Sequence, residues 1–251
     1  MGLIAENLSI GYPATTVASD IDIALATASL TVLIGANGSG KSTLLRTITG
    51  AQPALGGVVE LDGIDINDYP TARLARHLSL VLTDRTGGGG LRVSELVGIG
   101  RHPYSGFMGR LSEADREIIH RSISLVGLAH KKDEFMASLS DGERQKAMIA
   151  RALAQDTELI VLDEPTSFLD VAARFEIMGL LSRLAHDEGR TVLLSTHDTG
   201  PAFAVADRVW AIFDHHVAQG SLPEMIASGA LDKVYPGVVF DPRANDFRQK
   251  R

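Results

Sequence analysis

The chain has 251 residues, enough for one large domain or two small ones. Hydrophobic residues make up 45% and charged residues 22%, which argues against wholesale disorder and against a fibrous design. The formal net charge of -7 disfavours a broad nucleic-acid-binding surface, so we expect no nucleic-acid partner. The chain has no cysteine, which excludes structural disulfides and thiolate metal sites.

The sequence predicts neither a secretory signal nor a transmembrane helix. The N-terminus carries Glu6 and lacks a basic start followed by an apolar stretch. The apolar runs, such as Leu159–Leu162, are far shorter than the roughly 20 residues that a membrane-spanning helix needs. We therefore expect a protein that stays inside the cell and reaches a membrane only through its partners.

The first third of the chain contains strands around one glycine-rich loop. The loose alternation of Leu3–Ile10 suits an edge strand. The apolar run Leu30–Ile34 predicts a strand that feeds the glycine-rich loop, and Ser42–Thr49 predicts the following helix. Farther on, we expect a hairpin at 58–64, a helix over Tyr69–His77 and a buried strand at 78–82.

The middle of the chain predicts a helical insertion in an α/β core. Four consecutive glycines, Gly87–Gly90, suggest a hinge, and the pattern from Val93 to Ala154 is helical, with Ser112 opening one segment. Short β-branched runs around a helix at Val171–His186 then indicate a parallel sheet. A last strand pair at 209–218 leads to a tail with three prolines. We predict one domain, 1–251, with a core at about 1–86 and 155–220, a helical subdomain at about 91–154 and a tail at 221–251.

The glycine-rich loop fits the phosphate-binding pattern G-x-x-x-x-G-K-[ST] and lies between a predicted strand and a predicted helix. Backbone amides and the helix N-terminus favour phosphate oxygens, a lysine reaches the β- and γ-phosphates, and a serine binds Mg²⁺. The alternative, a simple glycine-rich turn, does not explain this context. The predicted ATP-binding residues are Gly35, Ala36, Asn37, Gly38, Ser39, Gly40, Lys41, Ser42 and Thr43.

Two carboxylates, Asp163 and Glu164, follow the apolar run Leu159–Leu162, at the strand end where open parallel sheets bind ligands. In this position Asp163 would bind Mg²⁺ and Glu164 would polarise the water that attacks the γ-phosphate. A pair of turn-forming acids before Pro165 is an equally good explanation of these two residues taken alone.

With these motifs, the chain resembles the ATP-binding subunits of ABC transporters from Tyr12 to about Gly220. The resemblance implies a P-loop NTPase (RecA-like) core with an N-terminal antiparallel β element and an inserted helical subdomain. It also implies an ATPase that uses ATP and Mg²⁺, and a place at the cytoplasmic face of the plasma (inner) membrane. The expected partners there are two transmembrane permease subunits and, indirectly, a substrate-binding protein.

Leu139–Glu143 resembles the signature motif of this family, usually written LSGGQ. In the family, the signature serine and glycine contact ATP on the opposite subunit, which implies a homodimer that sandwiches two ATP molecules. The matching residues also suit a helix cap with early acids, and both interpretations are compatible. The predicted trans signature residues are Ser140, Asp141, Gly142 and Glu143.

Other positions take their roles from the same resemblance. Asp170 matches the D-loop acid, His197 the switch histidine that supports the attacking water, and Tyr12 the aromatic side chain that stacks on adenine. With Glu164 and Lys41, His197 completes the predicted catalytic set. Asp84 stands at the Q-loop position, where the family has a glutamine; a carboxylate binds Mg²⁺ but donates no hydrogen bond.

The segment from Val97 to Tyr104 resembles the subgroup that serves importers of ferric siderophores, haem and cobalamin. The interpretation is therefore an ATPase for an iron-chelate importer, with a cobalamin importer as the alternative. Asp84 and Asp141 also leave open a nucleotide-gated module without turnover. A soluble ABC ATPase is a third possibility, although the chain has neither a coiled-coil insertion nor tandem ATPase domains.

Overall fold

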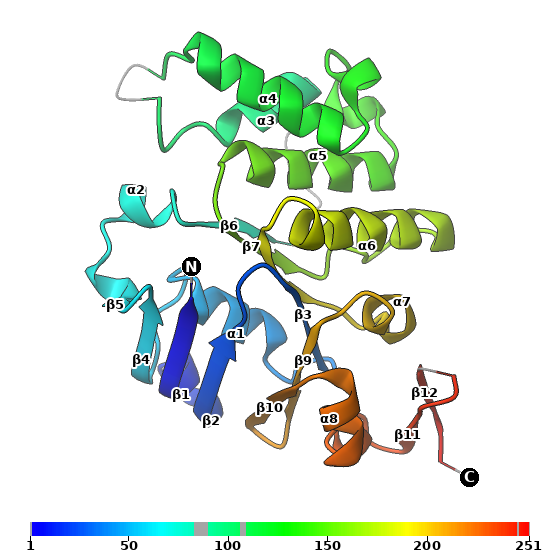
Figure 1. The fold of residues 1–251 in the computed structure, drawn as a ribbon. Coiled ribbons are helices and arrows are strands. Elements are labelled where there is room, and N and C mark those ends of the chain that lie inside the picture. Colours follow the sequence, from blue (N-terminus) through cyan, green and yellow to red (C-terminus); the bar gives the residue numbers. More distant parts are fainter. Residues whose placement is uncertain (1, 83–89, 106–108, 245, 251) are drawn as a thin grey trace.

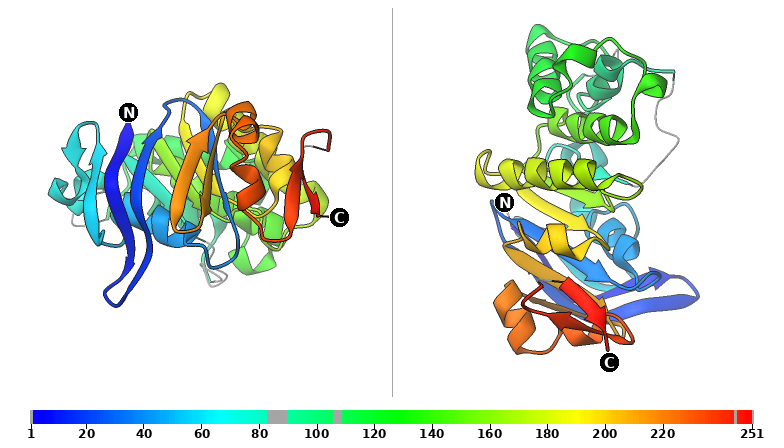
Figure 2. Two further views of the ribbon diagram at one scale, coloured as in Figure 1. Left: turned by 90° about the horizontal axis from the view of Figure 1, so that it is seen from below. Right: turned by 90° about the vertical axis from the view of Figure 1, so that its right-hand side faces the viewer.

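The computed structural model describes residues 2–82, 90–105, 109–244 and 246–250. Asp84 and most of the Gly87–Gly90 run lie outside these residues. Figures 1 and 2 show two lobes, with the long helices of the middle segment at one end and two sheets with the C-terminal segment at the other. The helical subdomain predicted at about 91–154 corresponds to the lobe that contains these helices.

A six-stranded sheet with the order β10-β9-β3-β8-β7-β6 forms the core. Neighbouring strands from β9 to β6 are parallel, and β10 is antiparallel to β9. Both faces of the central strands are covered, so β3, β7 and β8 are buried along their whole length: Val32 and Ile34 of β3 join one hydrophobic cluster and Leu33 joins the other. The strands are β3 (Leu30–Gly35), β6 (Leu78–Val81), β7 (Leu159–Asp163), β8 (Thr191–Ser195), β9 (Arg208–Phe213) and β10 (His216–Gly220).

The N-terminal β element is an antiparallel sheet with the order β2-β1-β4-β5. The prediction of an edge strand at Leu3–Ile10 was wrong, because β1 lies between β2 and β4. Its alternating pattern arises because only one face of this sheet is buried. The strands are β1 (Leu3–Tyr12), β2 (Thr15–Leu25), β4 (Gly56–Leu61) and β5 (Ile64–Asp65).

Helices of both lobes follow most of the sequence expectations. The exception is α2, a single turn at Thr71–Leu74 instead of Tyr69–His77, because Tyr69 precedes Pro70 and is extended. In α4, Ser112 is the N-cap and accepts a hydrogen bond from the Asp115 amide. The other helices are α1 (Lys41–Ile48), α3 (Val93–Ile99), α4 (Glu113–Leu125), α5 (Asp141–Ala154), α6 (Val171–His186) and α7 (Thr199–Phe203).

The C-terminal segment is folded against the core and is not a loose tail. It forms α8 (Leu222–Ala227) and a hairpin of β11 (Val238–Asp241) with β12 (Asp246–Gln249). Its apolar residues, including Met225, Leu231 and Phe240, are buried in the main hydrophobic cluster. The prolines did not prevent this, since Pro223 stands in the first turn of α8, where proline is tolerated.

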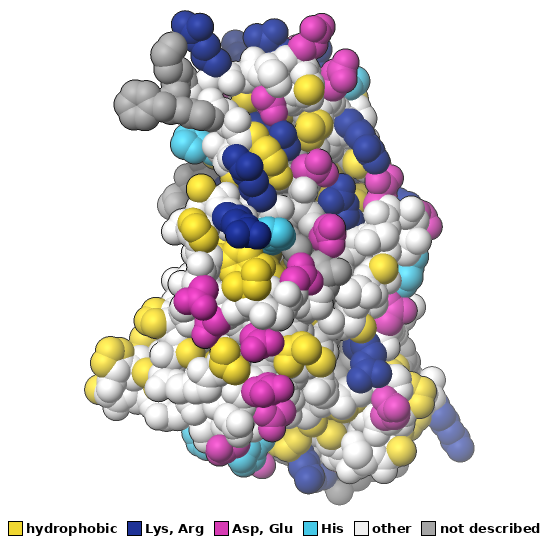
Figure 3. Space-filling model, turned by 60° about the vertical axis from the view of Figure 1, so that its left-hand side comes forward, with side chains coloured by type: hydrophobic (Ala, Val, Ile, Leu, Met, Phe, Trp, Pro, Cys, Tyr) yellow, Lys and Arg dark blue, Asp and Glu magenta, His cyan; other side chains and the backbone are white. Residues whose placement is uncertain are grey.

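On the face of the molecule shown in Figure 3, acidic and basic side chains are interspersed with apolar ones. Among the helices of the described residues, none is long and apolar enough to cross a membrane.

Candidate ATP-hydrolysis site

The glycine-rich loop connects β3 to α1, as the motif requires. Gly38 and Gly40 have φ values of 78° and 106°, in the left-handed region that favours glycine. A Cβ atom on Gly40 would also lie 2.4 Å from Val17 Cγ1, so only glycine fits there. The loop therefore directs its backbone amides and the N-terminus of α1 toward a bound anion.

Lys41 is buried at the first position of α1. Its ammonium donates to the carbonyl oxygens of Gly35 at 2.8 Å and Ala36 at 3.3 Å. The same nitrogen lies 3.7 Å from Glu164 Oε1. The Lys41 ammonium therefore contacts both the glycine-rich loop and Glu164, the acid that follows β7.

Asp163 ends β7 directly opposite Ser195, which ends the parallel neighbour β8. The Ser195 hydroxyl donates to Asp163 Oδ1 at 2.7 Å and accepts from the Glu164 amide at 2.9 Å. Ser195 thus orients both acids. Sequence reasoning missed Ser195, although its place at the end of an apolar strand, two residues before His197, was a usable signal.

Glu164 has a φ of 50°, in the left-handed region, and its side chain contacts His197, the predicted switch histidine. Glu164 Oε2 lies 2.6 Å from His197 Nδ1 and accepts from the Ser167 hydroxyl at 3.3 Å. The Glu164 side chain is only 16% exposed, whereas that of His197 is 52% exposed. The histidine therefore connects a mostly buried carboxylate to the open side of the site.

These groups, except Asp163 and Ser195, line one cavity of about 770 Å³, within the size range of small-molecule and cofactor sites. Most of the predicted catalytic and ATP-binding residues contribute to it, including Tyr12; Ser39 does not. Its wall also contains residues that the sequence did not suggest. The lining residues are Tyr12, Val17, Gly35, Ala36, Asn37, Gly38, Gly40, Lys41, Ser42, Thr43, Glu164, Ser167, His197 and Tyr235.

The residues predicted for Mg²⁺ offer suitable ligand chemistry. Ser42 and Asp163 supply a hydroxyl and a carboxylate, which are hard oxygen ligands, and Ser195 fixes one of the carboxylate oxygens. Within the described ranges, no group of three or more His, Cys, Asp or Glu residues is placed to hold a metal ion. A small number of protein ligands is typical of a Mg²⁺ ion that binds together with substrate phosphates, because the phosphates and water supply the other ligands.

The signature residues lie at the start of α5, and none of them lines the cavity. Ser140 is the N-cap: its hydroxyl accepts from the Glu143 amide at 3.3 Å, and its own amide donates to Glu143 Oε2 at 3.0 Å. Lys131 pairs with Glu143 Oε1 at 2.6 Å and Arg144 with Asp141 at 2.7 Å. The hydrogen bond from Lys131, followed by that from the Ser140 amide, lowers the pKa of Glu143 to about 2.

Of the two remaining predicted positions, Asp170 lies within the described residues. Asp170 is the N-cap of α6, and its Oδ1 accepts from the Ala173 amide at 2.8 Å. Asp84 falls outside the described residues, so the Q-loop assignment stays a prediction.

A phosphate-binding loop, two acids at the end of a parallel strand of the same sheet and a histidine beside them define a P-loop NTPase. The chain belongs to the ABC transporter family, whose pattern matches residues 18–167, and it is an ABC-type ATPase. This family and fold agree with the class that the motifs predicted.

Characterised relatives cover almost the entire chain. The iron(3+)-hydroxamate import ATP-binding protein FhuC of Bacillus subtilis is 37% identical over 97% of this chain and 92% of its own. The ferric enterobactin transport ATP-binding protein FepC of Escherichia coli is 35% identical over 93% of this chain and 86% of its own.

Solved structures agree in fold. A candidate metal-chelate type ABC transporter in an inward-facing conformation has a TM-score of 0.83 at 25% identity, covering 98% of this chain and 95% of its own. The dimeric bacterial ABC transporter cassette MJ0796 has a TM-score of 0.76 at 25% identity, covering 88% of this chain and 98% of its own.

Proposed function

We propose that this protein is the ATP-hydrolysing subunit of an importer for ferric chelates. The similarity to FhuC and FepC supports the cargo, because it extends over nearly the full length of the chain. The cavity itself binds nucleotide and not the cargo, so it carries no information on which chelate is imported. The proposed place of action is the cytoplasmic face of the membrane, through two permease subunits.

The position of the signature residues supports a homodimer. Ser140 and Gly142 belong to the helical subdomain and do not line the cavity of their own chain. Contact of these residues with ATP therefore needs a second copy of the chain, as in an ATP sandwich. The acidic departures from the family motif are compatible with this, since Asp141 and Glu143 are each paired with a cation on their own chain.

We propose a step in hydrolysis for each group of the site. Lys41 and the loop amides bind the phosphates, and Tyr12 packs on the adenine ring. Glu164 orients the attacking water and accepts its proton, while His197 holds the Glu164 carboxylate and supports the same water. Ser42 and Asp163 would hold Mg²⁺, which would supply positive charge to neutralise the phosphates. The observation that carries this mechanism is the contact of 2.6 Å between His197 and Glu164.

The cargo is tested by uptake in the organism that carries the gene. We expect deletion of the gene to abolish uptake of at least one ⁵⁵Fe-labelled siderophore or of haem, and the wild-type gene to restore it. The Glu164→Gln gene should not restore it, whereas Glu188→Gln, a change in a surface ion pair with Arg121, should. Loss of labelled cobalamin uptake with normal iron uptake would assign the alternative cargo.

The assembly is tested with detergent-solubilised membranes. Purification through a tag on this protein should yield complexes that contain two copies of the chain and two integral membrane subunits. These complexes should hydrolyse ATP in a Mg²⁺-dependent manner. A chain that stays free of membrane proteins in such a preparation would point to a soluble ABC ATPase. Tight ATP binding by an intact complex that never turns over would point to a nucleotide-gated module.

A further inference from the structure

The segment that carries His197 is anchored on two sides. On one side, Asp198 accepts hydrogen bonds from Arg174 Nη1 at 2.8 Å and from the Thr166 hydroxyl at 3.0 Å, which fixes it to α6 and to the turn after Glu164. On the other side, the Thr199 hydroxyl donates to Asp246 Oδ1 at 2.6 Å. The second anchor belongs to the C-terminal hairpin, for which the ATP-site motifs provide no role.

Aromatic packing reinforces the contact between the hairpin and α7. Phe203, the last residue of α7, meets Phe240 of β11 edge-on, with ring centroids 5.6 Å apart, and lies 6.4 Å from Phe247 of β12. Both Phe203 and Phe240 are buried. Helix α7, which has only five residues, is therefore held by the hairpin at both of its ends.

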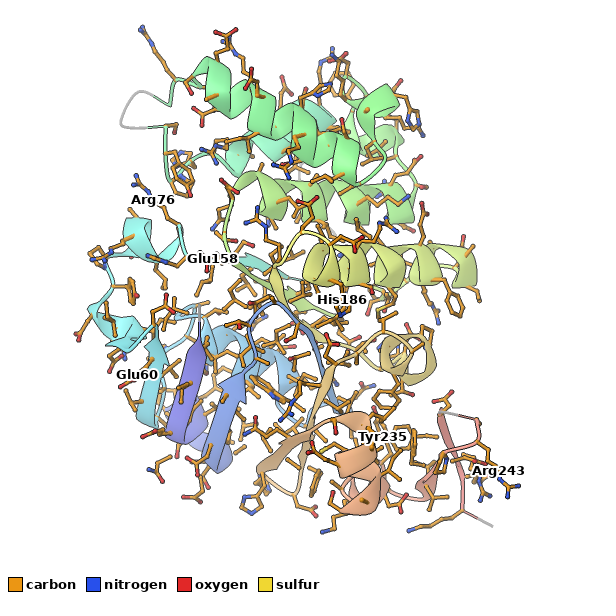
Figure 4. The ribbon with its side chains drawn as sticks, viewed as in Figure 1. Glu60, Arg76, Glu158, His186, Tyr235 and Arg243 are labelled. Atoms are coloured by element: carbon orange, nitrogen blue, oxygen red, sulfur yellow. The ribbon has the colours of Figure 1, made fainter. Side chains whose placement is uncertain are left out.

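The same C-terminal segment reaches the wall of the ATP cavity through Tyr235. Its ring packs edge-on against Phe247, at a centroid distance of 4.7 Å, and the residue lines the cavity together with Gly35 and His197. Figure 4 shows Tyr235 between α8 and the hairpin. Burial raises the pKa of Tyr235 to about 12, so its side chain stays neutral beside the phosphate-binding loop.

We propose that the C-terminal hairpin positions the switch histidine, and that Asp246 is the positioning residue that acts through Thr199. The hairpin packs on Tyr235, which lies in the cavity wall beside the phosphate-binding loop, and it also contacts the segment that follows His197. It thereby sets where the imidazole lies relative to Glu164 and the phosphates. This inference rests on the role of His197 in the proposed function.

The test compares Asp246→Ala with Asp246→Asn. The alanine removes the acceptor of the Thr199 hydrogen bond, whereas the asparagine retains an oxygen that accepts it. We expect kcat of Asp246→Ala to fall roughly tenfold, the scale of one hydrogen bond to a charged group, with KM for ATP unchanged within about twofold. Asp246→Asn should recover most of the loss. Thr199→Val should reproduce the alanine effect from the other partner, with Thr199→Ser as its rescue.

A matched control lies in the same hairpin. Asp241 pairs with Arg248 at 3.0 Å, and both residues belong to the hairpin. Asp241→Ala should therefore leave kcat within about twofold of wild type, although it removes an acid of the same kind. An equal loss in Asp241→Ala and Asp246→Ala would show that only the stability of the hairpin matters, and it would overturn the proposal.

Two further readouts separate positioning from general stability. Hydrogen exchange of the nucleotide-free protein should become faster at residues 196–203 in Asp246→Ala and stay unchanged in the glycine-rich loop. In a His197→Ala background, Asp246→Ala should cause no further fall in kcat, because it acts through the imidazole.

If the losses in kcat of His197→Ala and Asp246→Ala are additive, the inference is refuted, while the proposed function is unaffected. Full activity of His197→Ala itself would instead refute the role of His197 in the proposed function.

Discussion

His197 Nδ1 and Glu164 Oε2 lie 2.6 Å apart, although the two residues follow different strands of the central sheet. Strands β7 and β8 are parallel neighbours, so their carboxyl ends meet at one edge, and the residues after both strands share the cavity. The contact couples the carboxylate that we propose accepts a proton from water to an imidazole that is half exposed in the cavity.

Glu164→Gln tests the role of this carboxylate. The amide keeps the shape of the side chain but accepts a proton poorly, so kcat should fall at least about 100-fold, the usual contribution of general base catalysis. ATP affinity should stay within about threefold of wild type, because the loop amides are unchanged and Lys41 keeps its hydrogen bonds to the loop carbonyls. Steady-state hydrolysis and equilibrium binding of a fluorescent ATP analogue provide the two measurements. A variant that retains a tenth of the wild-type kcat would remove Glu164 from this role.

Ser195→Ala tests how the Mg²⁺ site is oriented. Loss of the hydroxyl frees Asp163 Oδ1 from its hydrogen bond of 2.7 Å. Partners of this kind typically contribute about 10- to 100-fold to metal affinity, so the Mg²⁺ concentration for half-maximal activity should rise by about tenfold or more. Ser182→Ala, which removes a hydroxyl beside His186 on α6, is the control and should leave the Mg²⁺ titration unchanged. An unchanged titration in Ser195→Ala would refute this orienting role.

The subgroup-like segment at 97–104 has a structural role that its sequence did not reveal. Arg101 is buried, with Nε donating to Asp115 Oδ1 at 2.7 Å and Nη1 to the Ala154 carbonyl at 2.9 Å. The ring of Tyr104 covers the guanidinium at 4.0 Å. These contacts join the segment after α3 to α4 and α5, so the segment stabilises the helical subdomain.

Asp115→Ala should therefore be strongly destabilising. Removing the carboxylate leaves the Arg101 charge buried and unpaired, which costs about 3–5 kcal/mol in the free energy of unfolding. Hydrogen bonds from Ser112, then from Arg101, lower the pKa of Asp115 to about 2. Because this pKa lies below the ordinary aspartate value, the carboxylate stabilises the protein above about pH 4, and the benefit disappears as pH falls toward 2. Urea titrations at several pH values should show that the difference in the free energy of unfolding between wild type and Asp115→Ala shrinks as pH falls. A difference that does not change with pH would contradict the ionic explanation.

Sequence predicted the parts of the site that are local in the chain. The loop from Gly35 to Ser42 and the acids after β7 were recognisable because each motif is contiguous and ends an apolar run. Tyr235 was not, since it reaches the cavity only through the packing of a segment about 200 residues away from the loop. The same limit explains β1, whose place between β2 and β4 depends on distant strands, whereas the shorter α2 follows from a local signal, Pro70.

Glu143→Gln tests the departure from the family signature. Glutamine still accepts the hydrogen bond from the Ser140 amide, but it loses the ion pair with Lys131, which is partly exposed. We expect the free energy of unfolding at pH 7 to fall by about 0.5–1 kcal/mol, the range of such pairs. Since the pKa of Glu143 is lowered to about 2, the wild-type advantage should be complete above about pH 4.5 and should vanish as pH falls toward 2. Lys131→Met should cause a similar loss, and combining both changes should add little, because they break one pair. Chemical denaturation between pH 2 and 7 measures all three variants, and fully additive losses would show that Glu143 and Lys131 stabilise the helical subdomain independently.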